Sequence, residues 1–293
     1  MKITQPIFLL IAGLILLITF CSCEKNIMID VPQAEEKIVV EGWIDQNDYP
    51  IVFLTKNLPY FGTIDSAMLF NIIIQDATVI VSDGSITDTL KLIPFPDFNY
   101  FPPIYYTGYK IKGEVGKTYN LTVKAEGKTL TATTTIPPPV YPDSVWFKIE
   151  PQQDSLGYLW GSFTDPPELG NYYRLFAKRF SKDKRYIPVL GSAYDDKFFN
   201  GQSFQFSMIR GVESATDTTV DEEFGFFKIG DTIGVKICTI DKAHYDFWRT
   251  AEGEMYSGGN PFVTPTQIVT NIEGGGLGVW GGYGVYYDTV IAK

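Results

Sequence analysis

Histidine and cysteine are scarce in this sequence, and their scarcity excludes several kinds of site. His244 is the only histidine, and the three cysteines are Cys21, Cys23 and Cys238. A zinc site needs a set of His and Cys ligands that the chain does not have, and no Gly-x-Ser-x-Gly motif is present. Any Ser-His-Asp or Cys-His catalytic arrangement would have to use His244. We therefore expect a protein that is not an enzyme, with no catalytic residues, no metal and no cofactor.

Basic residues are also few. There are 24 Lys and Arg against 34 Asp and Glu, which gives a formal net charge of -10. No cluster of Lys or Arg offsets this average, so the phosphate backbone of a nucleic acid would be repelled. We expect no nucleic acid among the partners.

The abundant residues indicate a globular protein that is mainly β. Hydrophobic residues make up 45% of the chain and charged residues 20%, which is typical of a packed protein. The combination of 21 Phe and 18 Tyr with 27 Gly and 18 Pro favours strands and turns over helices. A length of 293 residues favours two domains.

The N-terminal segment has the pattern of a bacterial lipoprotein signal. Lys2 precedes an uncharged apolar run over residues 6–20, which is shorter than the roughly 20 residues of a membrane-spanning helix. The run closes with Phe20-Cys-Ser-Cys23, where the small Ser22 precedes Cys23 as in a lipobox. Cys23 would then begin the mature chain and carry acyl chains, each buried CH₂ group contributing about 0.8 kcal/mol to membrane binding. The alternatives are an ordinary signal peptide cut near Ser22 and an uncleaved anchor.

The rest of the chain divides into β-rich parts. After the signal peptide over residues 1–22, a polar lipidated tether over 23–36 leads into six or seven short strands, the pattern of an immunoglobulin-like β-sandwich over 37–136. The Pro-rich residues 137–142 cannot supply the hydrogen bonds of a sheet, so we place a linker there. Residues 143–293 again have strand patterns. The expected fold is mainly β: an N-terminal immunoglobulin-like β-sandwich followed by a second β-sandwich-like domain with one α-helix and a Gly-rich C-terminus.

The expected helix covers about residues 241–252. Apolar and aromatic residues share one helical face there, with Thr239 or Asp241 as N-cap and Gly253 at the end. His244 lies on that face, which indicates a packed or capping histidine. Cys238 lies in an alternating strand pattern, which indicates a buried small hydrophobic residue.

Aromatic residues form the candidate binding surface. Residues 95–106 are too rich in proline for a central strand, and residues 273–287 interleave glycine with aromatic side chains. The candidate binding residues are Phe95, Phe98, Tyr100, Phe101, Tyr105, Tyr106, Trp280 and Tyr283. Each segment has a second interpretation: the first as a loop that covers its own domain's core, and the second as a strand whose glycines let neighbours approach closely.

Several of these features together resemble one known family. After the lipobox come Thr131-Ala-Thr-Thr-Thr-Ile-Pro137, His244-Tyr-Asp-Phe-Trp248, Asn271-Ile-Glu-Gly-Gly275 and Leu277-Gly-Val-Trp-Gly-Gly-Tyr-Gly284. The chain resembles the Bacteroidota lipoproteins grouped as domain-of-unknown-function family 4249. The resemblance implies an outer-membrane lipoprotein at the cell surface, encoded beside TonB-dependent receptors.

The expected function is that of a non-enzymatic surface lipoprotein. It would be held to the membrane by its N-terminal lipid, bind an extracellular ligand, and act as the accessory partner of an outer-membrane receptor of the TonB-dependent type. Two alternatives stay open: a cell-surface enzyme acting on glycan or peptide, and a structural lipoprotein of the envelope.

Overall fold

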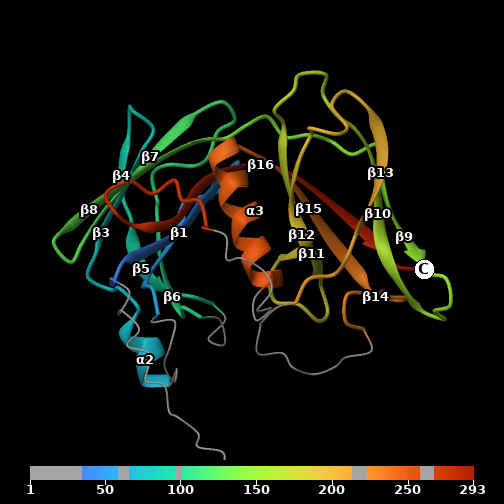
Figure 1. Ribbon diagram of the computed structural model, residues 1–293, viewed down its shortest axis with the longest axis horizontal. Coiled ribbons are helices and arrows are strands. Elements are labelled where there is room, and N and C mark those ends of the chain that lie inside the picture. Colours follow the sequence, from blue (N-terminus) through green and yellow to red (C-terminus); the bar gives the residue numbers. More distant parts are fainter. Residues whose placement is uncertain (1–34, 59–65, 97–100, 213–222, 258–266) are drawn as a thin grey trace, which may run out of the picture. The chain divides into compact units, whose positions relative to one another are not determined.

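The chain folds into strands joined by turns, with little helix. The computed structural model describes residues 35–58, 66–96, 101–212, 223–257 and 267–293 (Figure 1). The strands are β1 (Ile38–Asp45), β2 (Ile51–Lys56), β3 (Thr78–Ser82), β4 (Thr87–Thr89), β5 (Lys91–Pro94), β6 (Ile104–Thr107), β7 (Thr118–Ala125), β8 (Lys128–Thr135), β9 (Ser144–Ile149), β10 (Leu156–Thr164), β11 (Tyr172–Arg179), β12 (Ile187–Asp195), β13 (Ser203–Met208), β14 (Phe227–Lys228), β15 (Thr232–Ile240) and β16 (Leu277–Ile291). The helices are α2 (Ser66–Asn71) and α3 (Lys242–Ser257). The prediction of a mainly β fold is confirmed.

Eight strands form one large sheet. Their order is β12-β11-β15-β16-β1-β2-β6-β5, and β1 pairs with β16 in parallel. A second sheet has the order β4-β3-β7-β8, and a third has the order β13-β10-β14 with β9 also paired to β10. The large sheet packs against both smaller ones.

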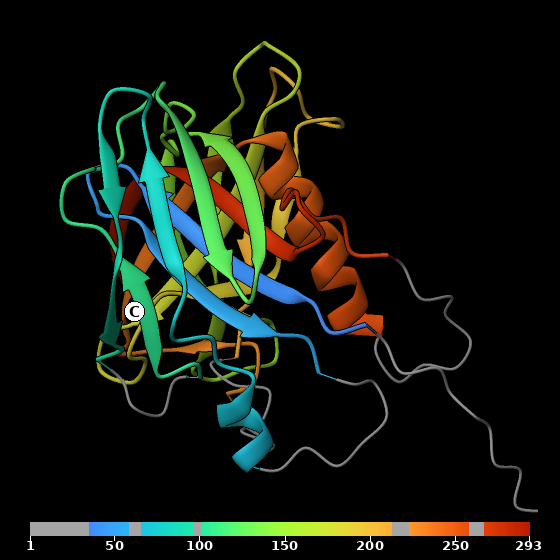
Figure 2. The same ribbon diagram turned by 90° about the vertical axis from the view of Figure 1, so that its left-hand side faces the viewer.

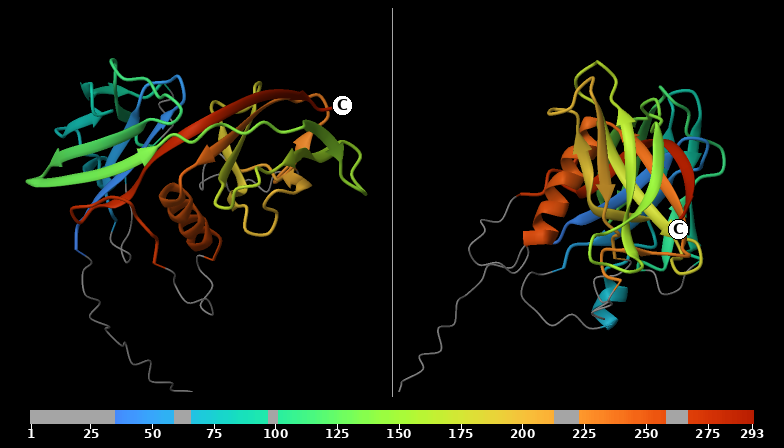
Figure 3. Two further views of the ribbon diagram at one scale, coloured as in Figure 1. Left: turned by 90° about the horizontal axis from the view of Figure 1, so that it is seen from above. Right: turned by 90° about the vertical axis from the view of Figure 1, so that its right-hand side faces the viewer.

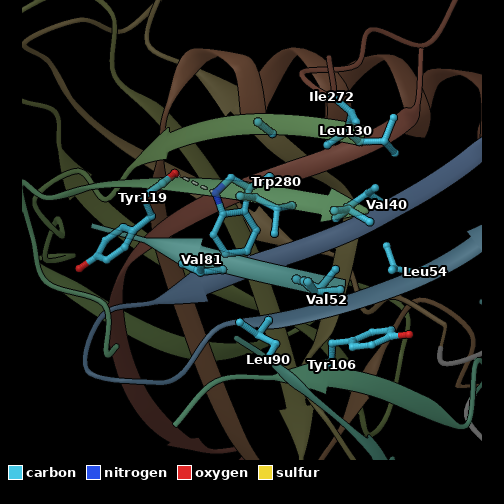
Figure 4. Close-up of a cluster of buried hydrophobic side chains, with 14 of the residues drawn as sticks. Val40, Val52, Leu54, Val81, Leu90, Tyr106, Tyr119, Leu130, Ile272 and Trp280 are labelled. Atoms are coloured by element: carbon cyan, nitrogen blue, oxygen red, sulfur yellow. Dashed lines mark hydrogen bonds between the residues drawn. The ribbon is translucent and has the colours of Figure 1, made fainter. Parts of the chain in front are cut away.

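The first core lies between the large sheet and the β4-β3-β7-β8 sheet. Val40 and Ile44 of β1 share a buried cluster with Leu121 of β7. Trp280 of β16 is fully buried in the same cluster, and its indole Nε1 donates a hydrogen bond of 3.0 Å to the Tyr119 carbonyl oxygen (Figure 4). The first predicted sandwich is therefore present, with a strand from the C-terminus added to it.

The second core lies between the other half of the large sheet and the third sheet. Leu159 of β10, Met208 of β13 and Phe227 of β14 are buried together. They pack with Leu175 of β11 and Val235 of β15. This arrangement is the second sandwich that the sequence predicts.

Strand β16 belongs to both sandwiches. Its residues 277–283 pair with β1, and its residues 284–291 pair with β15 (Figure 3). Residues Glu36–Lys293 accordingly form one compact unit. The domain division at residues 137–142 stays a prediction, but the sequence placed β16 in the second domain alone. A parallel partner for β1 could not be foreseen, because it comes from the far end of the chain with no turn to mark it.

The glycines of β16 allow close packing. A Cβ atom on Gly281 would lie 2.0 Å from Nδ1 of His244, and one on Gly284 would lie 2.1 Å from the carbonyl oxygen of Pro137. A Cβ atom on Gly282 would lie 2.8 Å from Cγ1 of Ile136. The interpretation of this segment as a closely approached strand is therefore confirmed.

Helix α3 lies beside the large sheet (Figure 2). Asp241 is its N-cap, because its Oδ1 accepts a hydrogen bond of 2.9 Å from the amide of His244. The other oxygen, Oδ2, accepts hydrogen bonds from Oγ1 of Thr134 and the amide of Thr135, which ties the helix start to β8.

The predicted end of the helix at Gly253 is wrong, since α3 continues to Ser257. A glycine inside a helix costs only about 1 kcal/mol, too little to end a helix that packs on a sheet. The short helix α2 was not predicted either.

Candidate functional site

A pocket of about 700 Å³ lies between α3 and the face of the large sheet that carries Glu41 and Trp43. Side chains alternate along a strand, so in β1 the residues Val40 and Ile44 enter the first core while Glu41 and Trp43 face the helix. We call this space the α3 pocket. Besides mostly apolar walls it has five charged lining residues, which are Glu41, Arg174, Arg185, Lys236 and Glu252. Its volume falls in the range of about 300–1,000 Å³ that is typical of small-molecule sites.

Arg174 of β11 is fixed on several sides. Its Nη1 donates a hydrogen bond of 2.5 Å to the hydroxyl of Tyr283, and its Nε donates one of 3.2 Å to Oγ of Ser192. The guanidinium carbon lies 3.4 Å from the ring centroid of Trp248 on α3, a cation–π contact. Arg174 is thus a rigid positive charge in the pocket wall.

Glu252 of α3 is held by Ser192. Its Oε2 accepts a hydrogen bond of 2.9 Å from the Ser192 amide, and its Oε1 accepts the Ser192 hydroxyl proton. Because Ser192 also contacts Arg174, the positive and negative charges are bridged by one hydroxyl group. This network fixes α3 to β12.

Lys236 of β15 forms a buried ion pair with Asp45 at the end of β1. Burial lowers the pKa of Lys236, but the Asp45 carboxylate, together with the nearby Cys238 and Tyr287, raises it, and the result lies above the ordinary value. The ammonium group also lies 4.9 Å from the ring centroid of Tyr283. Burial raises the pKa of Tyr283 to about 12, so this tyrosine keeps its proton at neutral pH.

Glu41 differs from the other charges of the α3 pocket. Within the described part of the chain its carboxylate forms no hydrogen bond and no ion pair. Burial raises its pKa, and the positive charges of Arg174 and Arg185 lower it in part. It also lines a smaller pocket, which shares Trp248 and Met255 with the α3 pocket. Glu41 is therefore a half-buried carboxylate that lines the α3 pocket without a partner among the described residues.

His244 lies against the pocket but is packed tightly. It is buried, its ring centroid lies 4.7 Å from that of Tyr283, and its Nδ1 has no hydrogen-bond partner among the described residues. Burial lowers its pKa well below the ordinary value, and the charge of Arg174 lowers it further. The imidazole is therefore neutral at pH 7 and is pressed against Gly281.

Cys238 is fully buried in β15, as expected of a small hydrophobic residue. Burial raises the pKa of its thiol to about 12. A protonated, enclosed thiol is a poor nucleophile.

The structure places the candidate aromatic residues in different environments. Phe95 and Tyr283 line the α3 pocket. Tyr105 is half-buried against Phe95, with ring centroids 5.5 Å apart, and Phe101 is exposed. Trp280 and Tyr106 are buried in the first core, so the expectation of an exposed surface is wrong for these two. They were misplaced because aromatic residues in a segment rich in glycine or proline have the same pattern in a core strand as in a loop. Phe98, Tyr100 and Cys23 lie outside the described residues.

Sequence reasoning missed the charged residues of the α3 pocket. Glu41, Arg174 and Lys236 each occupy one position in an otherwise apolar strand segment. A lone charge in such a strand is a usable signal, because a charge on a packed face needs a partner or a cavity. The sequence did not show that the three positions would face one another across four neighbouring strands.

A second pocket, of about 240 Å³, lies on the opposite face of the large sheet. Its lining is entirely apolar and aromatic, including Phe163, Phe204 and Ile237. It has none of the charges that distinguish the α3 pocket.

The described residues were also compared with the requirements of a membrane-spanning helix and of a metal site. None of their helices has the length and apolar character that crossing a membrane requires. They also contain no group of three or more His, Cys, Asp and Glu side chains placed to hold a metal ion.

Comparison with known proteins places the chain in a family. No curated protein matches the sequence. A family model, described as a domain of unknown function, matches residues 24–288. The match covers nearly all of the chain after the predicted signal peptide and includes both sandwiches, α3 and most of β16. The chain belongs to this family, DUF4249.

Proposed function

We propose that the protein is a non-enzymatic binding lipoprotein of the outer membrane. Lipid on Cys23 holds it at the cell surface, the α3 pocket binds an extracellular ligand, and the protein acts as accessory partner of a TonB-dependent type of receptor. The α3 pocket carries this proposal. It has the size of a ligand site, and three of its charged side chains, Arg174, Glu252 and Lys236, are held by neighbouring groups.

The chemistry of the pocket favours binding over catalysis. A nucleophile needs an adjacent general base, and the Nδ1 of His244, the one histidine of the chain, is enclosed by the fold. Arg174 and Glu252 are engaged with Ser192 and Tyr283. Such a rigid set of charges orients a ligand without reacting with it.

The anchor can be tested with a matched pair of cysteine variants. Cys23→Ala should move the protein from the membrane fraction to the soluble fraction and abolish incorporation of a palmitate label, because several acyl chains supply the membrane affinity. Cys21→Ala should leave both unchanged. The measurement is fractionation of cells with labelled palmitate. A Cys23→Ala protein that stays in the membrane with its label would overturn the lipid anchor.

The partner can be tested by capture from membranes. The tagged full chain, extracted in mild detergent, should retain an outer-membrane receptor in stoichiometric amount, identified by mass spectrometry. The Cys23→Ala protein should retain much less, because the anchor confines both partners to one surface and raises their effective concentration. Recovery of the protein from membranes without a stable receptor partner would contradict the accessory role.

A further inference from the structure

One charged side chain of the α3 pocket, Glu41, has no partner among the described residues. Arg174 and Glu252 share Ser192, and Lys236 is paired with Asp45. Glu41 has no hydrogen bond or ion pair within the described part of the chain. The Glu41 side chain is half-buried and lines the pocket, so its carboxylate remains available to a positively charged group of a ligand.

Positive charge lies near Glu41 without touching it. The guanidinium groups of Arg174 and Arg185 act on its carboxylate electrostatically, yet neither forms an ion pair with it. A purely cationic ligand would therefore meet two guanidinium groups, and a purely anionic ligand would meet the Glu41 carboxylate. A ligand with one ammonium group and one carboxylate meets an opposite charge at each end.

The remaining walls favour apolar side chains. Trp43, Phe95, Leu190, Val212 and Met255 line the pocket around these charges. A pocket of about 700 Å³ is larger than one small amino acid requires and fits a ligand with several apolar groups.

We propose that the α3 pocket binds a short zwitterionic peptide with apolar side chains. Its free ammonium group pairs with Glu41, its carboxylate lies on the guanidinium side of Arg174 and Arg185, and its side chains pack on the aromatic walls. This inference rests on the proposed function in one respect, that the α3 pocket is the ligand site. It adds the chemical class of the ligand.

Calorimetric titration of the detergent-solubilised full chain tests the ligand class. The probe is the tripeptide Leu-Phe-Leu, used with free ends, with an acetylated N-terminus and with an amidated C-terminus. The free peptide should bind, and each blocked form should bind at least about tenfold more weakly, because each loses one charge-assisted contact. Absence of binding by the free peptide, or equal binding of all three forms, would overturn the proposal.

A charge-neutral variant identifies the ammonium contact. Glu41→Gln should weaken binding of the free peptide about tenfold and leave binding of the acetylated peptide unchanged. Glu273→Gln, an exposed glutamate with the same change of charge, should leave both unchanged. Because the ratio of two peptides is measured on one protein sample, the result does not depend on the folded fraction. An unchanged ratio in Glu41→Gln would place the ammonium group elsewhere and overturn the assignment.

The two proposals fail separately. A chain that captures a receptor but does not bind the tripeptide overturns the ligand class and leaves the accessory role standing. A chain that binds the tripeptide through Glu41 but captures no receptor supports the ligand class and contradicts the accessory role.

Discussion

Replacement of Asp45 by asparagine should destabilise the protein by about 3 kcal/mol, because it leaves the buried ammonium group of Lys236 without a counter-charge. The two side chains join β1 to β15, which lie on either side of β16 in the large sheet. The measurement is urea denaturation of Asp45→Asn and wild type, followed by circular dichroism. Removing one partner of a buried ion pair lowers the free energy of unfolding by more than the intact pair contributes to it, because the remaining charge stays buried without a counter-charge.

Two further variants control this prediction. Asp246→Asn removes the partner of Lys242 in an exposed pair on α3 and should cost less than about 0.5 kcal/mol. The double variant Asp45→Asn/Lys236→Met removes both buried charges and should recover most of the loss. If Asp45→Asn were as mild as Asp246→Asn, the ion pair would not be the element that holds the two strands.

The same pair has a defined dependence on pH. The pKa of Lys236 is higher in the folded protein than its ordinary value of 10.5, despite burial, because of the Asp45 carboxylate. A group with a raised folded-state pKa contributes its full stability below the unfolded pKa and loses it as the pH rises through the folded one. The stability difference between wild type and Asp45→Asn should therefore be fully present at neutral pH and shrink in strongly alkaline solution.

Replacement of Trp280 by alanine should cost about 3–5 kcal/mol. The side chain is fully buried between the two sheets of the first sandwich, and its loss leaves a cavity and an unpaired Tyr119 carbonyl. Trp280→Phe, which keeps most of the volume but not the hydrogen bond, should cost less than half as much. Urea denaturation measures both.

Phe198→Ala provides the control for Trp280→Ala. Phe198 is 85% exposed, so removing this aromatic side chain should change the free energy of unfolding by less than about 0.5 kcal/mol. A Trp280→Ala protein of nearly wild-type stability would mean that β16 does not complete the first core.

The sequence predicted elements that depend on neighbours along the chain. The hairpins, the helix near residues 241–252 and the buried states of Cys238 and His244 follow from local periodicity. The predicted helix end was wrong because Gly253 was taken as the residue that ends the helix. Contacts between α3 and the large sheet continue beyond Gly253: the hydroxyl oxygen of Tyr256 accepts a hydrogen bond from the Gly191 amide.

The candidate site was predicted only in small part. Phe95 and Tyr283 were chosen as aromatic candidates and do line the α3 pocket, but the charged residues that define it were not chosen. Glu41 and Lys236 are far apart in sequence, and only the strand order β15-β16-β1 brings their faces together. That order depends on the parallel pairing of β1 with β16, which no local pattern specifies.

Because β16 belongs to both sandwiches, it also determines when the first sandwich can be completed during synthesis of the chain. A chain is made from its N-terminus, so β1 and the sheet that packs on it are available long before residues 277–291. Until the last residues arrive, β1 has an open edge and the first core lacks its largest buried side chain, Trp280. The first sandwich is therefore completed last, and a chain that ends early would present an unpaired, aggregation-prone strand edge.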